Sequence, residues 1–120
     1  MTRSHRRIGV LVRGNPAASL EAKEAIRLCV GLLLRNSDVH LFLSGESLKP
    51  FESGEGESDR EPEFLRHLRA FVEMGYTVVV EREALEALKG FASPLEVRVW
   101  SREEIIDFLT QCHELILATH

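Results

Sequence analysis

Short apolar runs alternate along this chain with longer segments whose apolar residues recur at helical spacing. The runs predict five strands, at residues 7–12, 38–43, 76–80, 95–100 and 114–118. The segments between them predict four helices, at residues 18–34, 58–74, 82–89 and 101–112. Strict alternation of strands and helices predicts an α/β fold of three layers, with a five-stranded, mainly parallel sheet between helices. Right-handed crossovers favour a doubly wound sheet of strand order 2-1-3-4-5.

Local signals refine the boundaries of these elements. Ser58 with Glu61, and Ser101 with Glu104, have the spacing of capping boxes, which predicts that helices begin there. Residues 46–58 are rich in Gly, Ser and Glu and are predicted to form a mobile loop. Residues 1–6 are predicted to form a basic N-terminal tail. A length of 120 residues favours a single domain over residues 1–120.

Composition narrows the classes of function. The 15 Lys and Arg residues against 19 Asp and Glu give a formal charge of −4, which favours neither nucleic acid nor an anionic membrane. No run approaches the roughly 18 apolar residues of a membrane span, and the N-terminus has no secretory signal, so a cytoplasmic location is expected. The two cysteines, Cys29 and Cys112, have no metal-ligand or disulfide spacing. Neither a metal nor a cofactor is expected.

The carboxyl ends of parallel strands form the edge where ligands bind in this fold class. Polar side chains of the chain at that edge are candidate ligand contacts for a polar or anionic small molecule: Arg13, Asn15, Ser44, Glu46, Glu81 and Arg82. The first corner, VRGNPAAS, lacks both GxGxxG and a P-loop ending. A phospho-receiver site is also excluded, because Arg13, Glu81 and Thr119 occupy the corners where it needs acidic residues, an aspartate and a lysine.

Nucleophilic chemistry has one weak candidate. Cys112 precedes His113, which suggests a thiolate and a base. However, Cys112 lies on an apolar stripe near the C-terminus of a helix, where the dipole disfavours a thiolate, and a packed, inert thiol is favoured. Cys29 lies in the middle of the first helical stripe, where core packing is expected.

The layout as a whole resembles the DsrE/DsrF-like proteins, which include subunits of bacterial sulfur-relay (Tus) complexes. The resemblance rests on IGVLVRGNPAASLEAKEAIRLCVGLLL, LFLSGESL, EREALEALKG and QCHELILATH, taken in this order. It implies assembly into homo-oligomers or hetero-oligomers with related subunits, and a role in cytoplasmic sulfur transfer. Catalytic members carry a persulfide-forming cysteine at the end of the third strand. This chain has Glu81 and Arg82 at that place.

Three hypotheses therefore stand at this point. The leading one is a non-catalytic, oligomer-forming DsrE/DsrF-like protein. The second is a small-molecule binding domain that uses the strand ends. The third is a sulfur-carrying protein that uses Cys112. For Glu81, the interpretation as an acidic residue at a helix N-terminus is favoured over ligand contact.

Overall fold

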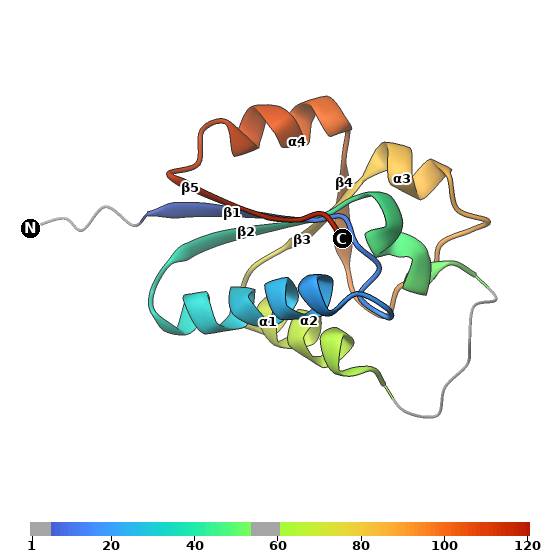
Figure 1. Cartoon of the computed structure of the whole chain (residues 1–120), viewed down its shortest axis with the longest axis horizontal. Coiled ribbons are helices and arrows are strands. Elements are labelled where there is room, and N and C mark those ends of the chain that lie inside the picture. The colour runs from blue at the N-terminus through green and yellow to red at the C-terminus, as the bar shows by residue number, and fades with distance from the viewer. Residues whose placement is uncertain (1–5, 54–60) are drawn as a thin grey trace, which may run out of the picture.

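A computed structural model describes residues 6–53 and 61–120 of the chain (Figure 1). Its strands are β1 (Arg7–Val12), β2 (Asp38–Leu43), β3 (Val78–Glu81), β4 (Val97–Trp100) and β5 (Glu114–Ala118). Its helices are α1 (Leu20–Leu34), α2 (Glu63–Glu73), α3 (Arg82–Glu86), α4 (Arg102–Leu109) and the 3₁₀ helix η1 (Gly45–Phe51). The predicted α/β class, with a five-stranded parallel sheet, is confirmed.

The strand order differs from the expected 2-1-3-4-5. The observed order is β4-β3-β2-β1-β5, so β2 and not β3 is central. The chain moves stepwise in one direction from β1 to β4, and α4 then brings it back across the sheet to the far side of β1. Because crossovers keep one hand, α1 and α2 lie on one face and α4 lies on the other (Figure 1). Strand patterns predict which segments form the sheet, but they leave the direction of each step open.

The two faces of the sheet have unequal apolar cores. On the face of α1 and α2, buried residues from four strands pack against both helices, with Ile26 and Leu68 among the helical contributors. On the face of α4, the buried cluster is small: Phe42, Val79, Ile105 and Leu109. Gly9 of β1 allows the close approach of α4, because a Cβ there would lie 2.6 Å from Leu109 Cδ2. One helix therefore covers a face as wide as the face that two helices cover.

The segment predicted as a mobile loop has regular structure in its first part. Residues 45–51 form η1, and Leu48 and Phe51 are buried in the larger core. The ring of Phe51 packs against Phe64 of α2 and against Phe91. Because the segment is mostly polar, its composition gave no indication that Leu48 and Phe51 would be buried. Residues 54–58 of the predicted loop, and residues 1–5 of the predicted basic tail, lie outside the described residues.

One of the two predicted capping boxes is present at the start of a helix. At α4, Ser101 Oγ accepts from the Glu104 N–H at 3.1 Å, and Glu104 Oε1 accepts from the Ser101 N–H at 2.9 Å, as predicted. The start of α2 was predicted too early, since the helix begins at Glu63 with Pro62 as its N-cap. Ser58, the other predicted cap, lies outside the described residues. In the described part of the chain, no helix is long and apolar enough to cross a membrane.

Candidate functional site

The carboxyl ends of β2 and β3 border a small cavity at one edge of the sheet. Its volume is about 250 Å³, and η1, α3 and the first residue of α4 complete its wall. The lining residues are Gly45, Glu46, Lys49, Glu81, Glu83, Ala84, Ala87, Leu88 and Arg102. Two of the six residues predicted from the sequence, Glu46 and Glu81, therefore share one cavity. Three carboxylates and two cations line it, so this cavity has no excess of positive charge for an anion.

Glu81 is the buried centre of this corner. It ends β3 and is the N-cap of α3, but its side chain makes no capping hydrogen bond. Only 6% of the residue is exposed. Its carboxylate instead accepts two hydrogen bonds from Arg102, with Nε to Oε2 at 3.1 Å and Nη2 to Oε1 at 3.4 Å. This two-pronged geometry is the strong form of a guanidinium–carboxylate pair.

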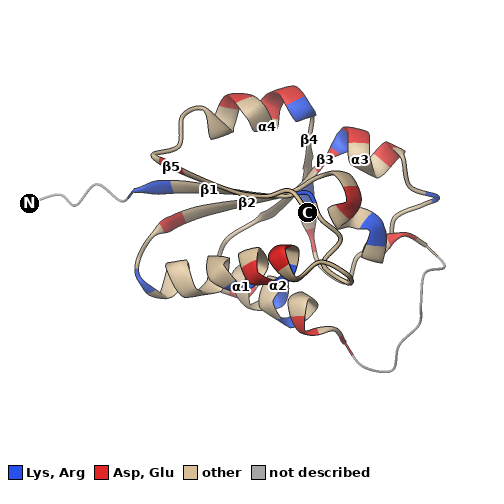
Figure 2. Ribbon diagram, viewed as in Figure 1, with Lys and Arg blue, Asp and Glu red and all other residues tan. Residues whose placement is uncertain are grey.

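The same arginine joins a second carboxylate. Glu83 Oε1 accepts from the backbone N–H of Arg102 at 2.9 Å, which holds the pKa of Glu83 below its usual value. The hydrogen bonds from Arg102 to Glu81, followed by the Coulomb attraction between them, raise the pKa of the guanidinium. These contacts connect the corner between β3 and α3 to the start of α4, a segment about twenty residues further along the chain. Figure 2 shows the charged residues of α3 and of the start of α4 on neighbouring elements.

Sequence reasoning missed Arg102, although the sequence carries a signal for it. A basic residue in the first turn of a helix opposes the helix dipole, and such a local conflict indicates a partner elsewhere in the fold. Arg102 is the first residue of α4, and Glu81 is the partner. Arg82, which the sequence did single out, is absent from the cavity lining. Its Nη2 atom lies 3.9 Å from Glu104 Oε1, on exposed side chains.

The remaining predicted contacts have different surroundings. Arg13 is exposed, and its guanidinium lies beside Gly45, where an added Cβ would lie 3.6 Å from Nε. Asn15 Oδ1 accepts from the Ala17 N–H at 2.9 Å and so stabilises its own turn. Ser44 is buried, and its carbonyl accepts from Ser47 Oγ at 2.6 Å. The structure therefore brings Arg13 to the rim of the corner and gives Asn15 and Ser44 roles within their own loops.

Neither cysteine belongs to this corner. Cys29 is fully buried in α1, its Sγ donates to the Ala25 carbonyl at 3.3 Å, and burial raises the pKa of its thiol to about 12. Cys112 precedes β5, so it lies at the amino-terminal ends of the parallel strands, whereas the corner lies at their carboxyl ends. Burial also raises the pKa of the Cys112 thiol. The neighbouring His113 is held by β1, because its Nδ1 accepts from the Arg7 N–H at 2.8 Å.

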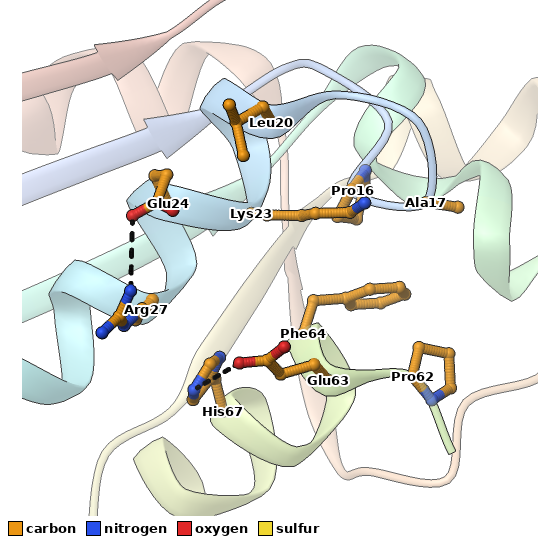
Figure 3. Close-up of a pocket in the computed structure, with 10 residues that line it drawn as sticks. All are labelled: Pro16, Ala17, Leu20, Lys23, Glu24, Arg27, Pro62, Glu63, Phe64 and His67. Atoms are coloured by element: carbon orange, nitrogen blue, oxygen red, sulfur yellow. Dashed lines mark ion pairs between the residues drawn. The ribbon is translucent and has the colours of Figure 1, made fainter. Parts of the chain in front are cut away.

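A larger cavity that the sequence did not indicate lies between α1 and α2 (Figure 3). Its volume is about 490 Å³, within the usual range for small-molecule sites. It is lined by Pro16, Ala17, Leu20, Lys23, Glu24, Arg27, Pro62, Glu63, Phe64 and His67. Arg27 Nη1 lies 3.9 Å from Glu24 Oε2, and His67 Nε2 lies 4.0 Å from Glu63 Oε1.

In the described part of the chain, no three His, Cys, Asp or Glu side chains are grouped to hold a metal ion.

Comparison with solved structures supports the class of fold that this arrangement defines. The chain is similar to the ychN protein from E. coli, whose crystal structure superposes with a TM-score of 0.76 at 17% sequence identity. The match covers 93% of this chain and 98% of that chain. A search of curated proteins gives no match. A family model described as the DsrE/DsrF-like family matches residues 6–117, and the chain belongs to that family.

Proposed function

We propose that this chain is a non-catalytic, oligomer-forming member of the DsrE/DsrF-like family, linked to cytoplasmic sulfur relay or sulfur metabolism. The observation that carries the proposal is the corner between β3 and α3. Where the family resemblance implies a persulfide-forming cysteine, this chain has a buried carboxylate bound by Arg102. A carboxylate cannot carry a persulfide, and its pairing gives it a structural role.

The two cysteines elsewhere in the chain are poor substitutes. The thiolate is the nucleophile in sulfur transfer, and a raised pKa reduces the thiolate fraction. Burial raises the pKa of both thiols, and Cys29 is enclosed in the core. The geometry thus gives no support to sulfur carriage on Cys112, the weaker alternative from the sequence.

Intact mass spectrometry after polysulfide treatment tests the non-catalytic part of the proposal. The native chain should gain no sulfur, whereas the denatured chain should be modified on its cysteines. Light scattering coupled to size exclusion tests the assembly. A monomer at high concentration, with and without a cysteine-bearing DsrE-like partner, would contradict it.

A small-molecule binding role is the second candidate, and the cavity between α1 and α2 favours it. Lys23 lines that cavity and has no ion-pair partner among the described residues. Small anions, nucleotides and sulfur compounds would be screened by their effect on the melting temperature. A stabilising compound should lose its effect in Lys23→Ala and keep it in Lys89→Ala, a matched change outside the cavity lining. A panel without any response would argue against this role.

A further inference from the structure

The two edge strands of the sheet differ in how they are protected. β4 is short, carries Arg98 in its middle and follows Pro94 closely, features that discourage pairing with another strand. β5 is Glu-Leu-Ile-Leu-Ala, and its one charged residue, Glu114, is held by Arg6 at 2.8 Å. Figure 2 shows the rest of β5 without charge. Within the part of the chain that the structure describes, the β5 edge therefore lacks the usual devices that prevent association.

Hydrogen bonding to β1 determines which backbone groups of β5 face outward. The N–H of Arg13 donates to the carbonyl of Ala118 at 2.7 Å, so Ala118 points its carbonyl toward β1. Alternate residues of a strand point their backbone groups to opposite sides. Ile116 thus also faces β1, while Leu115 and Leu117 direct their N–H and carbonyl groups away from the sheet. Among the described residues, no strand pairs with this outer side.

The side chains at this edge are apolar and incompletely covered. Leu115 and Leu117 are in register with Gly9 and Leu11, and Gly9 contacts α4, so both leucines lie on the face of α4. Leu115 is 48% exposed and Leu117 is 51% exposed. Ile116 points to the other face, where it packs against the larger core. An approaching strand would meet two half-exposed leucines on one face and Ile116 on the other.

We propose that β5 pairs antiparallel with β5 of a second copy of this chain, about a two-fold axis at Ile116. Leu115 then lies opposite Leu117 of the other copy, and the outward backbone groups of these residues form about four hydrogen bonds. The four leucines make one apolar cluster on the face of α4. The two sheets join into one sheet that runs through both copies. This inference rests on the proposed assembly and specifies its interface.

The occupant is a second copy because the strand is complementary to itself. In this register Glu114 lies opposite Ala118 of the other copy, so the like charges at the two strand starts stay apart. A two-fold interface requires such self-complementarity. Backbone pairing also removes the exposed edge from both copies at once, which a partner bound through side chains alone would not do.

Disulfide trapping tests this register. In the proposed pair, Ile116 lies opposite Ile116 of the other copy, at a position without direct hydrogen bonds. The Cα atoms of such a pair lie about 4.5 Å apart, which is within reach of a disulfide. In a Cys112→Ala background, Ile116→Cys should form a covalent dimer on mild oxidation. Glu114→Cys is the matched control, because it lies on the same face of the same strand. Its two copies would be more than roughly 10 Å apart, so it should stay monomeric in denaturing electrophoresis.

Light scattering on charge variants gives an independent test. Leu117→Lys should shift the population to monomer, whereas Val99→Lys on the opposite edge strand should leave the dimer intact. A wild-type chain that is monomeric on its own would overturn this interface, and one that also stays monomeric with a cysteine-bearing DsrE-like partner would overturn the proposed assembly as well. A wild-type oligomer in which Ile116→Cys fails to cross-link, or cross-links no better than Glu114→Cys, would overturn the β5 pairing and leave the assembly standing. The trapping result decides the matter if Leu117→Lys fails to fold.

Discussion

Replacing Glu81 by alanine tests whether its pair with Arg102 stabilises the corner between β3 and α3. The Glu81 side chain is only 8% exposed, and its carboxylate accepts two hydrogen bonds from a charged donor. A hydrogen bond to a charged group is worth about 1.5–3 kcal/mol. The Arg102 side chain is 58% exposed and regains water when the pair is lost, so the lower part of that range applies to the pair. Glu81→Ala should therefore lower the free energy of unfolding by about 1.5–2 kcal/mol.

The assay is urea unfolding at pH 7 followed by circular dichroism, supported by thermal melts. For a chain of this length the predicted loss corresponds to a fall in melting temperature of roughly 5–10 °C. Glu81→Gln keeps the shape and one acceptor oxygen, so it should lose less than Glu81→Ala. Glu86→Ala on the same short helix is the matched control and should be nearly neutral, because Glu86 is absent from the cavity lining.

A different outcome would refute the structural role. Natural proteins retain destabilising polar groups at binding and catalytic sites, and their removal often increases stability. If Glu81→Leu were more stable than the wild type, the pair with Arg102 would not be a net stabilising contact, and the proposed structural role would be refuted.

Three further predictions concern α4, the sheet face beneath it and the carboxylates at the corner. Gly9→Ala should destabilise by about 1–3 kcal/mol in urea unfolding, because its Cβ would overlap a leucine of α4, whereas Gly31→Ala, with open space, should be neutral or slightly stabilising. Ser101→Ala removes the N-terminal cap of α4 and should cost about 1 kcal/mol in the same assay, with a change below 0.3 kcal/mol arguing against the cap. The folded-state pKa of Glu83 lies below its ordinary value of 4.5, so its contribution is present above that pH and is lost as the pH falls through the folded pKa. Acid melts should therefore fall less steeply in Glu83→Gln, and an unchanged pH profile would contradict the contact with Arg102.

The parts of the fold that the sequence predicted depend on neighbouring residues. The bounds of β1, β2 and β5 follow from short apolar runs, and the start of α4 follows from the Ser101 capping box. Strand order was predicted incorrectly because it depends on where each crossover places the next strand, which no local pattern encodes. η1 was missed for a similar reason, since Leu48 and Phe51 form a core contact only once α2 has packed nearby.

The sequence predicted the position of the candidate site, but only some of the residues that form it. Parallel strands bring their carboxyl ends together, so Glu46 and Glu81 were correctly expected at one edge. The partner of Glu81 lies on a helix that begins after another strand, and only the misfit of Arg102 with the dipole of α4 indicated it. Arg82 was favoured because it follows Glu81 directly, but residues adjacent in sequence at a strand-to-helix junction point in different directions.

Because Glu81 and Arg102 form an ion pair at the corner where the family resemblance implies a thiol, we propose that the native chain carries no sulfur. Native chain would be treated with polysulfide, alkylated and mapped by peptide mass spectrometry, with denatured chain as the positive control for Cys29 and Cys112. We expect persulfide on the denatured chain and none on the native chain. Persulfide on Cys112 of the native chain, formed at the rate of an exposed low-pKa thiol, would contradict it.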